Sequence, residues 1–196
     1  NSNPDQMVTA AYSMLGNCWY NYPFNLWPYG DLASDDCLKG GSGTTDTGYH
    51  DVEIWSTLTS TRGELDELWY RLYCAISRCN RAIISLNDYG TEVLGEETAA
   101  IRMGEVKFLR AHFYFKLLTM FRQIPWITED AVLNGTHESI RNDEFTYEEL
   151  FAKVIADFEA AYDVLPEVPA DGGRTHKIAA AAYLAKCYLT LAWGDG

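Results

Sequence analysis

The chain has 196 residues, of which 47% are hydrophobic and 14% aromatic, enough apolar material for a sizeable buried core. It carries 28 acidic against 15 basic residues, a formal net charge of −13, and its Lys and Arg are scattered along the sequence. This balance argues against nucleic acid as a partner, because a phosphate backbone would be repelled. No stretch approaches the roughly 20 consecutive apolar residues that a membrane-spanning helix needs.

Five segments have the apolar spacing or the end signals of helices. In chain order they are Pro4 to about Leu15, Gly63 to about Asn87, about Glu96 to Phe121, Tyr147 to about Val164, and about Lys177 to Trp193. The first follows Asn3, a capping residue, and has proline at its first position. The fourth begins with the capping-box pattern Thr146-x-x-Glu149.

Two long connections separate these helices, residues 20–62, rich in Gly, Asp, Ser and Thr, and residues 125–145. Connections of this length in a compact domain are usually functional or mobile. Period-two alternation of apolar and polar residues is nearly absent, so few strands are expected. The sequence therefore predicts an all-α fold with long inserted loops.

The third predicted helix is apolar on two sides. One stripe comprises Val106, Leu109, Phe113, Leu117 and Met120, and the other comprises Phe108, Ala111, Phe115 and Leu118. Because the stripes lie about 100° apart, together they cover more than half of the helix surface. We expect this helix inside an array of stacked antiparallel helix pairs of tetratricopeptide-like type.

The same helix carries a family resemblance. The stretch "EVKFLRAHFYFKLLTMFRQIPW" resembles the most characteristic segment of SusD/RagB-type proteins, a Glu followed by Phe-Leu-Arg-Ala, aromatic residues and a Phe-Gly-x-x-Pro ending. The matching residues are Glu105, Phe108, Leu109, Arg110, Ala111, Tyr114, Phe121 and Pro125. Arg122 stands where that family usually has Gly.

Three further stretches resemble the same family in the same order. "AAYSML … YGDLASDD" is similar to its N-terminal helix and the Asp-rich loop that follows, and "LWYRLYCAISRCNRAI" is similar to its Trp-x-x-x-Tyr-x-x-Ile-x-x-x-Asn helix. "GRTHKIAAAAYLAKCYL" is similar to its Gly-Arg-x-x-Lys-x-Ala segment. Since members of the family are typically more than twice as long, we expect residues 1–196 to form one helical domain, its N-terminal, tetratricopeptide-rich half, with the C-terminal half absent.

The resemblance implies a function in nutrient uptake. It implies a surface-exposed lipoprotein of the outer membrane, typical of Bacteroidetes, that binds oligosaccharide for a polysaccharide utilisation system and delivers it to a SusC-like TonB-dependent transporter. A lipidated Cys upstream of Asn1 would be its anchor. We expect no enzymatic activity, no cofactor and no metal.

The candidate ligand site is the stretch from Gly30 to Trp55. Sugar binding requires a flat aromatic face and a few directional polar groups, and in the family the ligand-contacting residues lie just beyond the matching Asp-Asp. Candidate ligand-binding residues are Asp35, Asp36, Lys39, Tyr49, His50 and Asp51, with Asp46 as a further carboxylate and Tyr49 as the stacking face. Starch binders of the family carry Trp where this chain has Lys39-Gly40-Gly41, so the glycan is expected to differ from starch. A disordered Gly/Ser/Thr loop is the alternative.

Glu105 and Arg110 are expected to be structural. Arg110 stands among apolar neighbours and needs a carboxylate or helix-end carbonyls, because burying an unpaired guanidinium is costly. We expect it to clamp two helices together.

Two other functions stay open. A helical-repeat adaptor that binds a peptide in its groove would fit the predicted helix array. An all-α glycoside hydrolase would need two carboxylates about 5 to 10 Å apart. With 28 acidic residues, the sequence neither supplies nor excludes such a pair.

Overall fold

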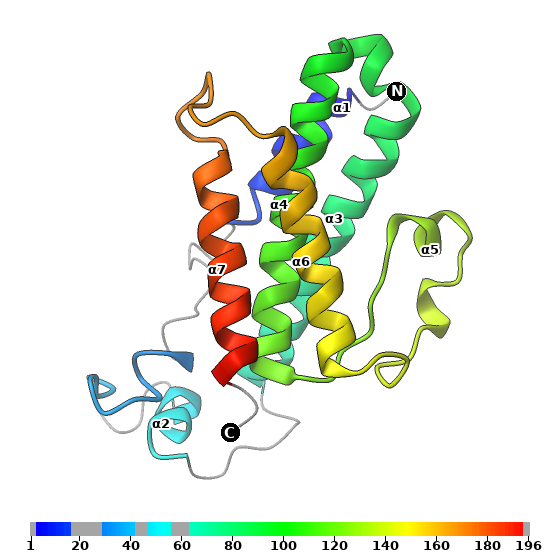
Figure 1. The fold of residues 1–196 in the computed structure, drawn as a ribbon. Coiled ribbons are helices and arrows are strands. Elements are labelled where there is room, and N and C mark those ends of the chain that lie inside the picture. The colour runs from blue at the N-terminus through cyan, green and yellow to red at the C-terminus, as the bar shows by residue number, and fades with distance from the viewer. Residues whose placement is uncertain (1–2, 17–28, 42–46, 56–62, 194–196) are drawn as a thin grey trace. The chain divides into compact units, whose positions relative to one another are not determined.

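The computed structural model describes residues 3–16, 29–41, 47–55 and 63–193 (Figure 1). Every regular element in this part of the chain is helical, and the predicted all-α fold is confirmed. The elements are α1 (Pro4–Tyr12), α2 (Thr47–Glu53), α3 (Gly63–Leu94), α4 (Glu96–Phe121), α5 (Glu129–Leu133), the 3-10 turn η2 (His137–Ser139), α6 (Tyr147–Val164) and α7 (Lys177–Trp193). None of these helices is long and apolar enough to cross a membrane.

The chain divides into two compact units. The larger comprises residues 1–14 and 72–196, and the smaller comprises residues 15–71. Helix α3 begins within the smaller unit and continues through the larger one. A single helical domain over residues 1–196 stays a prediction.

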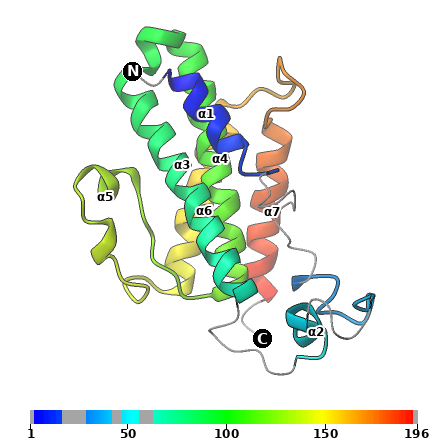
Figure 2. The ribbon, with the colours of Figure 1, turned by 180° about the vertical axis from the view of Figure 1, so that it is seen from behind.

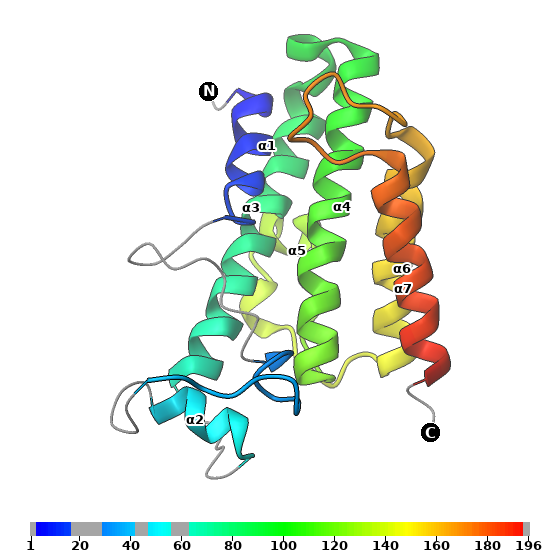
Figure 3. The same ribbon diagram turned by 90° about the vertical axis from the view of Figure 1, so that its left-hand side faces the viewer.

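The larger unit is a stack of helices with α4 at its centre. Helices α3 and α4 run antiparallel, α6 and α7 form a second antiparallel pair, and α4 lies between α3 and that pair (Figures 1 and 3). Seen from behind, α1 crosses the pair formed by α3 and α4 (Figure 2). Helix α4 packs against α1, α6 and α7.

Helix α4 occupies the interior position that its two apolar stripes predict. Eight of the nine stripe residues are buried, and the ninth, Met120, is half-buried. The start of α4 lies close to the end of α6 at Gly104, because a Cβ added there would collide with Cγ2 of Val164 and that side chain would have to move. Burial on both sides explains why this helix carries so many large apolar groups.

Three of the five predicted helices begin and end where the sequence indicates. Helices α4, α6 and α7 have the predicted bounds, and the capping box of Thr146 and Glu149 is formed at the start of α6. Helix α1 ends at Tyr12, earlier than predicted, and α3 extends to Leu94, later than predicted. Gly95, whose φ of 80° is readily adopted only by glycine, then makes the turn into α4. The short elements α2, α5 and η2 lie within the two predicted connections.

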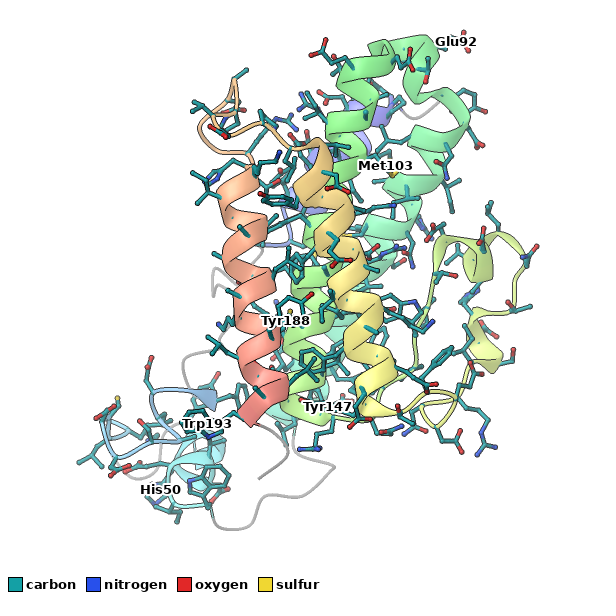
Figure 4. The ribbon with its side chains drawn as sticks, viewed as in Figure 1. His50, Glu92, Met103, Tyr147, Tyr188 and Trp193 are labelled. Atoms are coloured by element: carbon teal, nitrogen blue, oxygen red, sulfur yellow. The ribbon has the colours of Figure 1, made fainter. Side chains whose placement is uncertain are left out.

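Helix α7 packs through one side only within the described part of the chain. Its buried side includes Ala180 and Cys187. Tyr188 and Trp193, labelled in Figure 4, are exposed, as are Ile178 and Leu189.

Candidate functional site

The Asp-rich segment of residues 31–36 forms a turn held by one serine. The Ser34 hydroxyl donates to the carbonyl of Asp31 at 2.7 Å and accepts from the backbone N–H of Asp36 at 3.2 Å. Leu32 is fully buried and fixes the base of the turn, while Asp35 and Asp36 are exposed. This local hydrogen bonding keeps both carboxylates available to a ligand.

A single carboxylate connects α2 to the segment that follows this turn. The backbone N–H of Lys39 donates to Oε2 of Glu53 at 3.1 Å, and Nδ1 of His50 lies 3.3 Å from the same oxygen. His50 projects from α2 one turn before Glu53 (Figure 4). Glu53 is the less exposed partner, at 15% against 49% for the His50 side chain. The Glu53 carboxylate therefore holds Lys39 and His50 close to each other.

Trp55 adds an aromatic face beside the turn. Its indole Nε1 donates to the carbonyl of Ala33 at 3.2 Å, while the residue stays 70% exposed. Its backbone has a φ of 52°, in the left-handed region that side chains rarely adopt. An exposed, hydrogen-bonded Trp is an amphipathic surface of the kind that stacks on the apolar side of a sugar ring.

The structure brings together some of the predicted residues. Lys39 and His50 meet at Glu53, and Asp35 and Asp36 lie on the turn to which Trp55 is bonded. Tyr49 and Asp51 are half-buried on α2. Asp46 lies outside the described residues. These six candidate residues stay a prediction.

Two residues of this region escaped the sequence reasoning, Glu53 and Trp55. The available signal for Trp55 was its residue type, since Trp presents the largest aromatic face. No sequence signal identified Glu53, because its contact is with the backbone N–H of Lys39, which lies 14 residues away in the chain.

No group of three or more His, Cys, Asp or Glu side chains in the described ranges is arranged to hold a metal ion. Three of the polar candidate residues, Asp35, Asp36 and His50, are instead exposed. That arrangement suits hydrogen bonds to several hydroxyl groups of one ligand.

Arg110 is buried at the centre of the larger unit, where it joins four elements. Its guanidinium donates to both carboxylate oxygens of Asp157 on α6, at 2.7 and 2.9 Å, and to Oδ1 of Asn80 on α3 at 3.1 Å. It also pairs with Glu129 at the start of α5. Burial opposes ionisation of Glu129, but Arg110 holds the pKa of that carboxyl below its usual range.

Glu105 and Arg110 do not pair with each other, although they are five residues apart. Glu105 is buried and accepts from Arg102 at 2.9 Å and from Arg174 at 2.7 Å. Arg102 also donates to Asp5 on α1 at 2.6 Å. Burial raises the pKa of Glu105 despite the two guanidinium groups. This second network joins α1, α4 and the segment before α7.

Comparison with curated proteins identifies relatives of one kind. A SusD-like family model, described as starch-binding and associating with the outer membrane, matches residues 30–189. A SusD-like protein of Formosa agariphila is 33% identical over 129 residues, which cover 64% of this chain and 23% of the relative. A SusD-like protein of Bacteroides ovatus is 24% identical over 195 residues, 98% of this chain and 34% of the relative.

Comparison with solved structures gives the same result. A laminarin-binding SusD-like protein superposes with a TM-score of 0.80 at 25% identity, covering 97% of this chain and 40% of the other. Surface glycan-binding protein A from Bacteroides uniformis superposes with a TM-score of 0.75 at 25% identity, covering 96% and 41%. The chain thus spans about a quarter to a third of these curated relatives and about two fifths of these structures.

Proposed function

The chain belongs to the SusD-like family, and from this premise we propose that it binds oligosaccharides at the outer membrane of a bacterium. The observation that carries the proposal is the superposition of nearly the whole chain on a laminarin-binding protein of the same family. All but the first residue of the candidate turn region falls within residues 30–189, which the family model matches.

The proposed binding surface consists of the turn region, which is defined as residues 29–41 and 47–55. Trp55 and Tyr49 would offer aromatic faces to sugar rings. Hydroxyl groups would be bound by the polar candidates Asp35, Asp36, Lys39, His50 and Asp51. The left-handed backbone of Trp55 supports this assignment, because residues in sparsely populated conformations cluster at ligand sites.

The wider role follows from the family. The protein would be a surface lipoprotein that captures oligosaccharide and delivers it to a SusC-like TonB-dependent transporter. Capture and delivery require binding and release without chemistry, so we propose no catalysis and no cofactor. The net charge of −13 is compatible with neutral sugars as ligands, since these carry no charge to be repelled.

The experiment is a calorimetric titration of the 196-residue chain with laminarin oligosaccharides, accompanied by a glycan array. Tyr49→Ala and Trp55→Ala should each lower the affinity for the glycan that binds. Loss of one stacking face is worth about 1 to 2 kcal/mol, roughly a tenfold loss of affinity.

Tyr89→Ala is the matched control, because Tyr89 is also a surface tyrosine, half exposed on α3. Its affinity should equal that of the parent. If the array finds a glycan that both turn-region variants bind as well as the parent, the assignment of the binding surface to the turn region is wrong. If the chain binds no glycan on the array or in the titration, the proposed function fails.

A further inference from the structure

Two side chains at the end of α2 bind the chain on both sides of residues 34–38. Before this stretch, the carbonyl of Ala33 accepts from the indole N–H of Trp55 at 3.2 Å. After it, the backbone N–H of Lys39 donates to the Glu53 carboxylate at 3.1 Å. The part of the Asp-rich turn that carries its exposed carboxylates is therefore attached to the end of α2 at both of its ends.

Buried residues anchor both partners of this attachment. Leu32, next to Ala33 in the chain, is fully buried, and Val52, next to Glu53, is 5% exposed. The bond from Lys39 to Glu53 is itself partly buried. A hydrogen bond that is shielded from water is electrostatically stronger than an exposed one, so this bond restrains the backbone more than a surface contact would.

The backbone of Trp55 also indicates a residue that is held in place. Its φ of 52° lies in the left-handed region, which is costly for every residue except glycine. Such conformations persist where the surrounding structure restrains the residue, and the bond to Ala33 is one restraint of this kind. That bond uses the N–H at the edge of the indole and leaves the residue 70% exposed.

We propose that Glu53 is a positioning residue, which raises the affinity for the ligand without touching it. Its carboxylate and the indole N–H of Trp55 form a clamp that holds the Asp-rich turn against the end of α2. The inference rests on the proposed function, because it takes Asp35 and Asp36 to be ligand contacts. Ordering an unclamped turn on binding would cost conformational entropy and lower the affinity, whereas the clamped turn is already ordered when the ligand arrives.

The clamp itself is tested without a ligand. Glu53→Ala removes the acceptor of the Lys39 N–H, whereas Glu53→Gln keeps an oxygen acceptor on a side chain of the same length. Hydrogen exchange of the Lys39 amide, followed by NMR in the 196-residue chain, should be about fivefold faster or more in Glu53→Ala, the equivalent of one net hydrogen bond. In Glu53→Gln the exchange rate should be close to that of the parent.

The role of the clamp in binding is tested by calorimetric titration with laminarin oligosaccharides, or with the glycan that the array identifies. Glu53→Ala should bind about fivefold more weakly than the parent, and Glu53→Gln should restore the affinity to within about twofold. In a chain that already carries Asp35→Ala and Asp36→Ala, the further change Glu53→Ala should lower the affinity by less than about twofold. A residue that acts through these carboxylates loses its effect when they are absent.

Glu67→Ala is the matched control. Glu67 is also a helical glutamate of the smaller unit, and it pairs with Arg71 on its own helix, α3. This variant should match the parent in the exchange of the Lys39 amide and in affinity. Trp55→Phe tests the other half of the clamp if Glu53→Ala does not fold, because it removes the indole N–H and keeps an aromatic ring. It should lower the affinity about threefold or more.

Three results would overturn the inference. Unchanged exchange of the Lys39 amide in Glu53→Ala would show that the clamp does not form. Faster exchange with the parent's affinity would show that the clamp does not serve binding, and this result leaves the proposed function intact. Equal losses of affinity from Glu53→Ala with and without Asp35 and Asp36 would show that Glu53 does not act through the turn. A parent chain that binds no glycan refutes the proposed function together with this inference, whatever the amide exchange shows.

Discussion

Charged side chains are placed differently in the helical framework of residues 72–193 and in the turn region of residues 29–41 and 47–55. In the framework, Arg110, Asp157 and Glu105 are buried and paired with partners on other elements. In the turn region, Asp35 and Asp36 lie at the surface. A buried pair connects helices and its loss is costly, whereas an exposed carboxylate contributes little to stability and remains available to a ligand. We therefore expect the framework charges to contribute to stability and propose that the turn-region charges contribute to ligand binding.

The largest expected effect is the loss of the Arg110 network. In Arg110→Met the carboxylates of Asp157 and Glu129 would keep their positions without a cation. Breaking a buried pair in this way costs about 3 to 5 kcal/mol of folding free energy. Urea denaturation of variant and parent should show that loss, while glycan affinity, measured where both are folded, should be unchanged.

The control for this variant is Asp157→Asn, which nearly preserves volume and removes the other member of the bidentate pair. It should also be destabilised and should also bind normally. If Arg110→Met retained the parent's stability but lost binding, Arg110 would belong to a ligand site and the comparison between the two regions would break down.

His112 is an exception to the pairing of buried polar groups in the framework, and it should make stability depend on pH. Its pKa is about 3 in the folded protein and near 6.5 when unfolded. Between these values the unfolded chain binds more protons, so stability falls as pH falls through this window. From about pH 7.5 to about pH 5 the contribution of His112 should be a loss of about 2 kcal/mol.

The measurement is urea denaturation of the parent and His112→Phe at both pH values. The introduced phenyl ring would fit among Phe108, Phe113 and Tyr183, the rings that already contact the imidazole. The variant should lose less stability than the parent between the higher and the lower pH. Equal losses would mean that His112 is not excluded from water as the structure describes.

The helices of the framework were largely predictable, because residues that pack in the core recur at helical spacing in the sequence. The two stripes of α4 and the capping box at Thr146 fix helix positions through local spacing alone. The partners of Glu105 and Arg110 were not predictable, because Arg174 and Asp157 lie 69 and 47 residues away. Sequence reasoning showed that Arg110 needs a carboxylate, but not which one.

The structure of the turn region was less predictable from the sequence. Its composition indicated a ligand site only through the family resemblance, since exposed residues obey no packing period. Trp55 and Glu53 acquire their roles from bonds to backbone atoms of Ala33 and Lys39. Every non-proline residue offers the same backbone N–H and carbonyl groups, so the sequence does not show which of them a side chain will bind. For this reason the sequence did not predict the roles of Trp55 and Glu53.

The smallest expected effect concerns Arg122, at the end of the framework's central helix. It has φ 57° and ψ −64°, and the N–H of Gln123 donates to the carbonyl of Phe121 at 2.6 Å, which together make a strained γ-turn. Glycine, the family's usual residue here, would remove a backbone strain of about 1 kcal/mol. It would also remove the contact between the Arg122 guanidinium and the Tyr147 ring, 4.5 Å from the ring centre, which stabilises the fold by about 0.5 to 1 kcal/mol. Arg122→Gly should therefore differ from the parent in stability by less than about 0.5 kcal/mol. Arg122→Ala keeps the strain and loses the contact, so it should be less stable than the glycine variant by about 1 kcal/mol. Equal stability of the two variants in urea denaturation would show that the turn at Arg122 is not strained.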